Sequence, residues 1–209
     1  MEKKIKIAVN GGIGFGAKLT ARQLLALAKY LGENEELELT TFQQLYIEIP
    51  EERKDEVIKE FQEAGLSCYP VGNYVKSLRT CNFCKGEIEE GMPVAIDLNK
   101  RIAGVPVPFT LKPAYTGCPV GCGEPLVNDI GIMKVNDHYN LYIGGKSKGA
   151  DAEAGTLFKE RLNPDELYAT VENLLQIYGS LGKKREPFHK FLKRMGIEEV
   201  SRLVQEKTS

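Results

Sequence analysis

Four of the five cysteines fall in two short pairs, and this spacing constrains the fold more than any other feature of the 209-residue chain. The pairs are Cys81–Cys84 and Cys118–Cys122. A thiolate is a soft anionic ligand, and two cysteines this close together can both bind one metal ion or one face of a cluster. Glycine and proline surround the second pair, so the chain there can turn tightly and direct backbone N–H groups at sulfur. We therefore expect the four cysteines to form one metal site.

The chemistry of the four thiolates leaves three alternatives open. By spacing alone, the four thiolates favour a zinc ion first and an iron–sulfur cluster second. A disulfide framework is the third alternative, but the segment Met1–Lys4 does not resemble a secretory signal, which favours a reduced, cytoplasmic protein. The fifth cysteine, Cys68, stands apart, and we expect it to be a free thiol that is at least partly buried.

Composition and charge exclude several classes of protein. With 42% hydrophobic and 27% charged residues, the chain is globular and long enough for one sizeable core or two small ones. Its net charge is −1, from 28 basic and 29 acidic side chains, which gives no electrostatic basis for binding nucleic acid. No apolar run approaches the roughly 20 residues that cross a bilayer, so we expect no membrane span.

The first part of the chain, residues 1–71, predicts a ferredoxin-like half domain of the α+β class. Apolar alternation, a capping box and helix stop signals place six elements in the order β-α-β-β-α-β, the split βαβ order. The first strand has Ile5, Ile7 and Val9 on one face, and the helix after Thr20–Gln23 has Leu24, Leu27, Ala28 and Leu31 inward and Gly32 at its end. Two strands follow over 37–41 and 45–49. A helix started by Pro50, with Val57, Phe61 and Ala64 inward, and a strand over 66–71 complete the unit.

Residues 72–209 predict a second α+β unit, rich in turns around the cysteines. We expect a helix over 88–102 and an extended segment over 107–115 before the second cysteine pair. A hairpin should follow, turning at Asn136-Asp137. Asn163 to Glu166 then starts a further helix, and two short helices separated near Gly196 finish the chain.

One motif suggests another class of protein. Gly12-x-Gly14-x-x-Ala17 follows a strand and precedes a helix, as the dinucleotide-binding fingerprint does. Glu38 stands about where the ribose-binding acid of that fingerprint is expected. The strands predicted next are too close together for a helical crossover, so they indicate an antiparallel hairpin instead. The glycines then serve close approach of the backbone to a ligand or partner.

Several segments taken together resemble the nitrite and sulfite reductase family, over nearly the whole chain. They occur in the family's order: Asn10-Gly11-Gly12, Lys18 to Leu24, Leu39 to Gln44, Gly72-Asn73-Tyr74-Val75, Gly117-Cys118-Pro119-x-x-Cys122, and Tyr139 to Lys146. Larger members of the family contain two such repeats, so this chain looks like a small, single-repeat member.

The resemblance implies a four-iron four-sulfur ([4Fe-4S]) cluster held by Cys81, Cys84, Cys118 and Cys122, and a sirohaem joined to it through Cys122. Reducing sulfite or nitrite takes six electrons, which such a pair of cofactors supplies one at a time. The implied partners are a small anionic substrate and a low-potential electron donor such as ferredoxin. A single repeat provides only half of the walls that enclose the cofactor in larger members of the family. We therefore expect either a homo-oligomer that covers the pocket or an open sirohaem face.

The chain also departs from the family pattern. The first family cysteine normally stands where Leu78 stands here, three residues before Cys81. Of four usual anion-binding cations, two are present as Lys76 and Lys112, which we predict to be catalytic and to bind the cofactor. The other two positions hold Phe42 and Thr110.

Three further cations could replace the missing ones. These are Lys18, Arg79 and Lys146, of which Lys18 and Lys146 are predicted to bind the cofactor; a solvated surface charge is the alternative for each. The leading hypothesis is a cytoplasmic sulfite or nitrite reductase. The alternative is an iron–sulfur electron-transfer or tetrapyrrole-binding protein without that activity, and a structural zinc protein is the third possibility.

Overall fold

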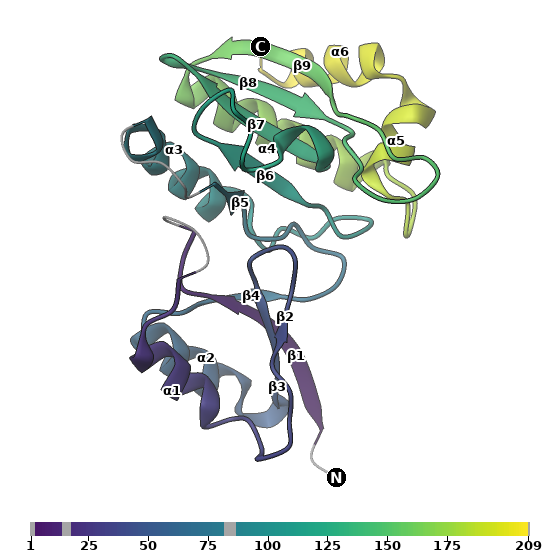
Figure 1. Cartoon of the computed structure of the whole chain (residues 1–209). Coiled ribbons are helices and arrows are strands. Elements are labelled where there is room, and N and C mark those ends of the chain that lie inside the picture. Colours follow the sequence, from purple (N-terminus) through teal and green to yellow (C-terminus); the bar gives the residue numbers. More distant parts are fainter. Residues whose placement is uncertain (1–2, 14–17, 82–86, 209) are drawn as a thin grey trace. The chain divides into compact units, whose positions relative to one another are not determined.

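The computed structural model describes residues 3–13, 18–81 and 87–208, with the backbone alone for residues 87–90 and 208. Its internal contacts divide the chain into two compact units, Met1–Val71 and Gly72–Ser209. Each unit has its own sheet and its own helices (Figure 1). Within the described part of the chain, no helix combines the length and the apolar character needed to cross a membrane.

The first unit has the split βαβ order that the sequence predicts, and the α+β class is confirmed. Its elements are β1 (Lys4–Asn10), α1 (Ala21–Ala28), β2 (Glu38–Leu39), β3 (Leu45–Pro50), the 3-10 turn η1 (Glu51–Arg53), α2 (Lys54–Glu63) and β4 (Ser67–Pro70). The four strands lie in the order β2-β3-β1-β4, with every neighbouring pair antiparallel. Because a dinucleotide-binding unit needs β1 beside a parallel strand, this sheet excludes it.

Helix α1 begins as predicted, but the side chains that it turns inward differ from the predicted ones. Thr20 and Gln23 form the predicted capping box, in which each side chain accepts from the other residue's backbone N–H. Gln23 also turns inward and donates to the carbonyl of Gly65, 2.7 Å away. Since Gln23 takes the inner position, Leu24 is turned outward and is 49% exposed. Ala28 is exposed as well, so the predicted burial of both residues is wrong. The helix ends at Ala28, before Gly32.

The core of the first unit lies between its helices and its sheet. Phe61 and Val57 of α2 are fully buried, as the helical spacing predicts. They pack with Leu27 of α1 and with Val9 and Ile47 from the sheet. The half-buried Cys68 side chain packs against this cluster as a free thiol, and burial raises its pKa to about 11.

The second unit contains a mixed five-stranded sheet, with its strands in the order β5-β6-β7-β8-β9. Strands β5, β6 and β7 are parallel to one another, and β7-β8 and β8-β9 are antiparallel pairs. The strands are β5 (Arg79–Thr80), β6 (Pro113–Thr116), β7 (Ile130–Val135), β8 (His138–Ile143) and β9 (Thr156–Leu162). The helices are α3 (Glu87–Ile102), α4 (Pro164–Leu181), α5 (Phe188–Met195) and α6 (Ile197–Thr208), with the 3-10 turn η2 at Pro125–Val127. Figure 1 shows α4 along the sheet, with α3 and α6 beside it.

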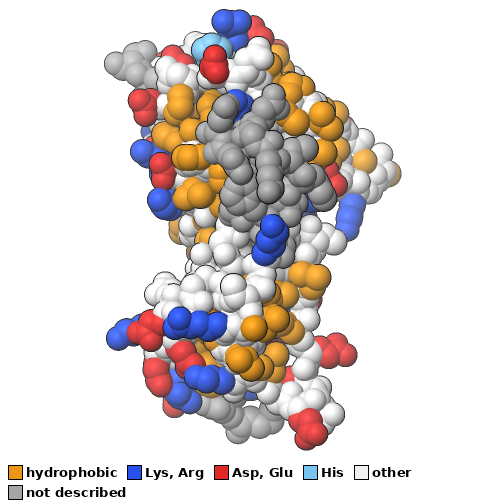
Figure 2. All heavy atoms as spheres, turned by 60° about the vertical axis from the view of Figure 1, so that its left-hand side comes forward, with side chains coloured by type: hydrophobic (Ala, Val, Ile, Leu, Met, Phe, Trp, Pro, Cys, Tyr) orange, Lys and Arg blue, Asp and Glu red, His pale blue; other side chains and the backbone are white. Residues whose placement is uncertain are grey.

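Most predicted elements of the second unit are confirmed, and two strands were missed. Ile132 pairs with Leu141 across the predicted hairpin, and Asn136 adopts the left-handed conformation that its turn requires. Strand β5 is too short to give a pattern, and β9 carries three consecutive charged residues and a register shift that hide its alternation. In the face shown in Figure 2, Lys and Arg side chains mix with Asp and Glu on each unit, in keeping with the net charge of −1.

Candidate functional site

The first cysteine of the site, Cys81, lies at the end of β5, directly beside the end of β6. Parallel pairing of Thr80 with Tyr115 sets this position, and the Cys81 N–H donates to the Tyr115 carbonyl at 3.3 Å. The side chain is 3% exposed. Its Sγ accepts from the N–H of Gly117 at 3.2 Å, and the hydroxyl of Thr116, a possible second donor, lies 3.6 Å from it. Hydrogen-bond donors at a ligating sulfur orient it and tune the metal group that it holds.

The second cysteine pair lies on a loop that folds back on β6. At Gly123, an added Cβ would lie 2.0 Å from the carbonyl oxygen of Tyr115, so the backbones approach as closely as only glycine allows. Gly121 turns the chain with a φ of 79°. The loop keeps Cys118 half-buried and leaves Cys122 exposed.

The described part of the chain shows no preformed site for a single metal ion. Among the described residues, no three His, Cys, Asp or Glu side chains are placed to hold a single metal ion. An iron–sulfur cluster separates its thiolates because each cysteine binds a different iron, whereas zinc gathers four ligands on one centre. Cys84, the fourth predicted ligand, lies outside the described residues. The soft thiols and the donors at Cys81 fit a cluster.

The predicted cations Lys76 and Lys112 lie on adjacent extended segments. Val75 and Leu111 form a parallel bridge, and the Lys76 N–H donates to the Leu111 carbonyl at 2.9 Å. Both bridging side chains are fully buried. Successive side chains of an extended segment point to opposite faces, so Lys76 and Lys112, the next residues, are expected on the face opposite the buried Val75 and Leu111. Lys112 is exposed and Lys76 is partly exposed.

A carboxyl group that the sequence did not indicate lies beside Lys112. Asp129 accepts the backbone N–H of Lys112 at 2.8 Å. Burial raises the pKa of this carboxyl from 3.8 to about 6, although the hydrogen bond and the charge of Lys112 lower it. Asp129 precedes β7 with no repeat or spacing that would single it out.

The three further cations, Arg79, Lys146 and Lys18, have surroundings that differ from those of Lys76 and Lys112. Arg79 forms an ion pair with Glu124 at 2.6 Å, which ties β5 to the end of the cysteine loop. Lys146 is paired with Asp151, whose other oxygen lies 3.4 Å from His189. Lys18 belongs to the first unit and is exposed.

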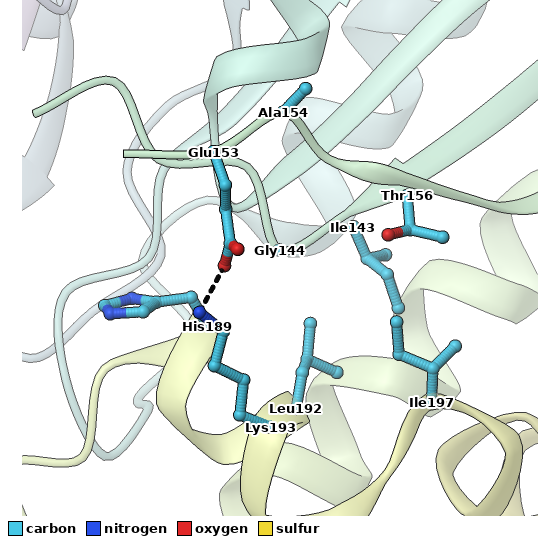
Figure 3. Close-up of a pocket in the computed structure, with 9 residues that line it drawn as sticks. All are labelled: Ile143, Gly144, Glu153, Ala154, Thr156, His189, Leu192, Lys193 and Ile197. Atoms are coloured by element: carbon cyan, nitrogen blue, oxygen red, sulfur yellow. Dashed lines mark ion pairs between the residues drawn. The ribbon is translucent and has the colours of Figure 1, made fainter. Parts of the chain in front are cut away.

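His189 also borders a pocket of about 140 Å³ between the end of β8 and helices α5 and α6. In Figure 3, an ion pair between Glu153 and Lys193, 2.8 Å long, closes one side of this pocket, and Leu192 and Ile197 line another. The acid and the base neutralise each other there. The pocket therefore offers no net charge to an anion.

Each residue that departs from the family pattern has a structural role in the fold. Leu78 is 1% exposed, and its N–H donates to the buried side chain of Asn99 at 2.8 Å. Phe42 is 5% exposed. Thr110 donates its hydroxyl to the carbonyl of Gly72. Leu78 is therefore a core residue, and its side chain has no ligand chemistry.

Comparison with known families identifies the class of protein. The family model of the nitrite and sulphite reductase 4Fe-4S domain matches residues 74–209. The chain therefore belongs to the nitrite and sulfite reductase family, as its motifs predict.

The chain is also similar to individual relatives with different names and to a solved structure. The chain is 33% identical over 195 residues to cobalt-factor III methyltransferase of Priestia megaterium, covering 93% of this chain and 36% of that protein. It is 25% identical over 132 residues to the assimilatory-type sulfite reductase of Nitratidesulfovibrio vulgaris strain Hildenborough, covering 63% of this chain and 60% of the relative. The structure of the Mycobacterium tuberculosis NirA protein shares the fold, with a TM-score of 0.74 at 16% identity over 98% of this chain and 40% of NirA. The chain thus spans 36% and 60% of the two relatives' lengths.

Proposed function

We propose that this chain is a cytoplasmic oxidoreductase that uses a [4Fe-4S] cluster and sirohaem to reduce sulfite or nitrite. The observation that carries the proposal is the Cys81 sulfur, buried and facing two hydrogen-bond donors from the segment that leads into the second cysteine pair. It belongs to a chain whose residues 74–209 match the family's 4Fe-4S domain.

In this proposal the four paired cysteines hold the cluster. Cys81 is held by the strand pairing and by its two donors. Cys118 and Cys122 are held by the loop that Gly123 packs against β6. The exposure of Cys122 suits the sulfur that is shared with sirohaem. When bound, the cluster and sirohaem would supply single electrons to the anionic substrate.

Lys76 and Lys112 bind and orient the anionic substrate and the acidic rim of sirohaem. They follow directly on the paired residues Val75 and Leu111, so in this proposal their charges act on one region. Each ammonium group also holds protons at Nζ, which can move to substrate oxygen as it leaves. Preorganised cations beside developing negative charge lower the free energy of the transition state.

The proposal is tested on the chain after anaerobic reconstitution. The ultraviolet–visible spectrum, with iron, sulfide and zinc analysis, separates sirohaem plus cluster from a bare cluster and both from zinc. The loaded protein is then given sulfite or nitrite with a low-potential artificial donor, the role we assign in the cell to a donor such as ferredoxin. We expect both cofactors and reduction of at least one anion. Stoichiometric zinc in place of iron would overturn the proposal.

A second candidate is a tetrapyrrole-binding or electron-transfer protein that does not reduce these anions. Two observations favour it. Phe42 and Thr110, which stand where the family has cations, are respectively buried and hydrogen-bonded to Gly72. The relative matched over 93% of this chain is named a cobalt-factor III methyltransferase and not a sulfite or nitrite reductase. Loaded protein that reduces neither sulfite nor nitrite would favour this candidate.

A further inference from the structure

The hydroxyl of Thr116 has one hydrogen and two acceptors within reach. Its Oγ1 lies 3.3 Å from the carbonyl oxygen of Cys118 and 3.6 Å from the Sγ of Cys81. The Thr116 side chain is fully buried, so water does not compete for this hydrogen. The hydroxyl can donate to only one acceptor at a time, and the charge on each acceptor decides which one receives it.

We propose that Thr116 sets the reduction potential of the iron–sulfur group held by Cys81, by turning its hydroxyl hydrogen toward the sulfur when that group gains an electron. This inference rests on the proposed function, because it needs a cluster at Cys81. The electron comes from an external one-electron donor of low potential. The hydrogen stays on Oγ1 throughout, and no covalent bond of the chain forms or breaks.

The direction of the effect follows from electrostatics. Reduction adds one negative charge, which the cysteine sulfurs share. A hydrogen bond to a charged acceptor is stronger than one to a neutral acceptor, so the bond to the thiolate sulfur strengthens as reduction adds negative charge to it. The Thr116 hydrogen bond therefore stabilises the reduced form more than the oxidised form, and it raises the reduction potential. The neutral Cys118 carbonyl is the resting acceptor.

Thr116 is suited to this role by its place in the sheet. It is the last residue of β6 and pairs with Met133 of β7, so its backbone is fixed. The parallel pairing of Thr80 with Tyr115 brings Cys81 beside Thr116, and their side chains meet on one side of the sheet. A β-branched side chain has few χ1 rotamers, which keeps Oγ1 near both acceptors while the hydroxyl hydrogen rotates. The second donor, the Gly117 N–H, has a fixed direction.

The test compares Thr116→Val, which has the same shape without the hydroxyl, with Thr116→Ser, which keeps the hydroxyl. Each reconstituted protein is titrated anaerobically and the reduced cluster is followed by electron paramagnetic resonance. We expect Thr116→Val to lower the equilibrium constant for reduction about tenfold, or about 59 mV for a one-electron couple. Thr116→Ser should stay near wild type.

The outcomes separate this inference from the proposed function. Equal potentials in wild type and Thr116→Val, with equal iron and sulfide content, would overturn the inference and leave the proposed function standing. If Thr116→Val loses the cluster, Thr116→Ala is titrated in its place. Loss of the cluster from both, with retention in Thr116→Ser, would assign Thr116 to cluster assembly and overturn its role in setting the potential. A wild-type chain that binds no iron and sulfide would overturn both proposals.

Discussion

The Sγ of Cys81 lies 3.2 Å from the backbone nitrogen of Gly117, and this contact joins the two cysteine segments within the protein itself. The two residues are far apart in sequence, and parallel pairing of β5 with β6 brings them together. The donor N–H directly precedes Cys118. A sulfur held in this way has less conformational entropy to lose when a cluster forms.

The first prediction concerns the ligands. Cluster ligands must be thiolates, so changing Cys81, Cys84, Cys118 or Cys122 to serine should strongly reduce iron and sulfide content after reconstitution. Cys68→Ser is the matched control and should keep both near the wild-type level, because burial raises the pKa of Cys68 to about 11 and keeps it neutral. Iron loss in Cys68→Ser together with retention in Cys81→Ser would show that the ligands were assigned wrongly.

The second prediction concerns Lys76 and Lys112. Removing either charge with Lys76→Met or Lys112→Met should slow anion reduction by about a hundredfold, equivalent to roughly 3 kcal/mol of transition-state stabilisation. Lys190→Met, an exposed lysine on α5, is the control and should leave the rate unchanged. Rates are compared at equal cofactor content with a low-potential artificial donor. Wild-type rates in both variants would remove these lysines from the mechanism.

The third prediction concerns the cysteine loop. Gly123→Ala places a methyl group 2.0 Å from the Tyr115 carbonyl oxygen, which belongs to the backbone and has little freedom to move. We expect a loss of about 1–3 kcal/mol of stability and reduced cluster content. Gly179→Ala is the control, because nothing lies within 4 Å of its added Cβ in α4. That variant should be roughly 0.5–1 kcal/mol more stable, since alanine favours helix. Denaturant unfolding measures both effects, and equal stability of the two variants would contradict the loop packing.

Local signals in the sequence predicted much of the fold. The capping box at Thr20 and the hairpin turn at Asn136 depend on neighbouring residues, and both are confirmed. The side of α1 that faces the sheet was missed, because it depends on a hydrogen bond from Gln23 to Gly65, a residue distant in sequence. Periodicity contains no information on such a contact.

In the candidate site too, local features could be predicted from the sequence and contacts between distant residues could not. The cysteine spacing predicted a shared site, but the donors Thr116 and Gly117 at the Cys81 sulfur became visible only through the pairing of β5 with β6. Asp129 escaped notice because its raised pKa comes from burial, which depends on the assembled sheet rather than on neighbouring residues.

The last prediction concerns Asp129 and pH. Its pKa is raised from 3.8 to about 6 by burial, so the folded protein binds this proton more tightly than the unfolded chain does. The protonated group's contribution to stability is therefore fully present below about pH 4 and is lost as the pH rises through about 6. A shift of this size corresponds to at most about 3 kcal/mol.

Asp129→Asn removes the titration while keeping an oxygen that can accept the Lys112 N–H. The variant should therefore gain stability over wild type as the pH rises from about 4 to 6, and the gain should be constant above about 7. Asp137→Asn, in the exposed hairpin turn, is the control and should follow the wild-type pH dependence. The measurement is denaturant unfolding at several pH values. Parallel stability curves for wild type and Asp129→Asn would show that the Asp129 carboxyl titrates alike in the folded and unfolded chain, contrary to this prediction.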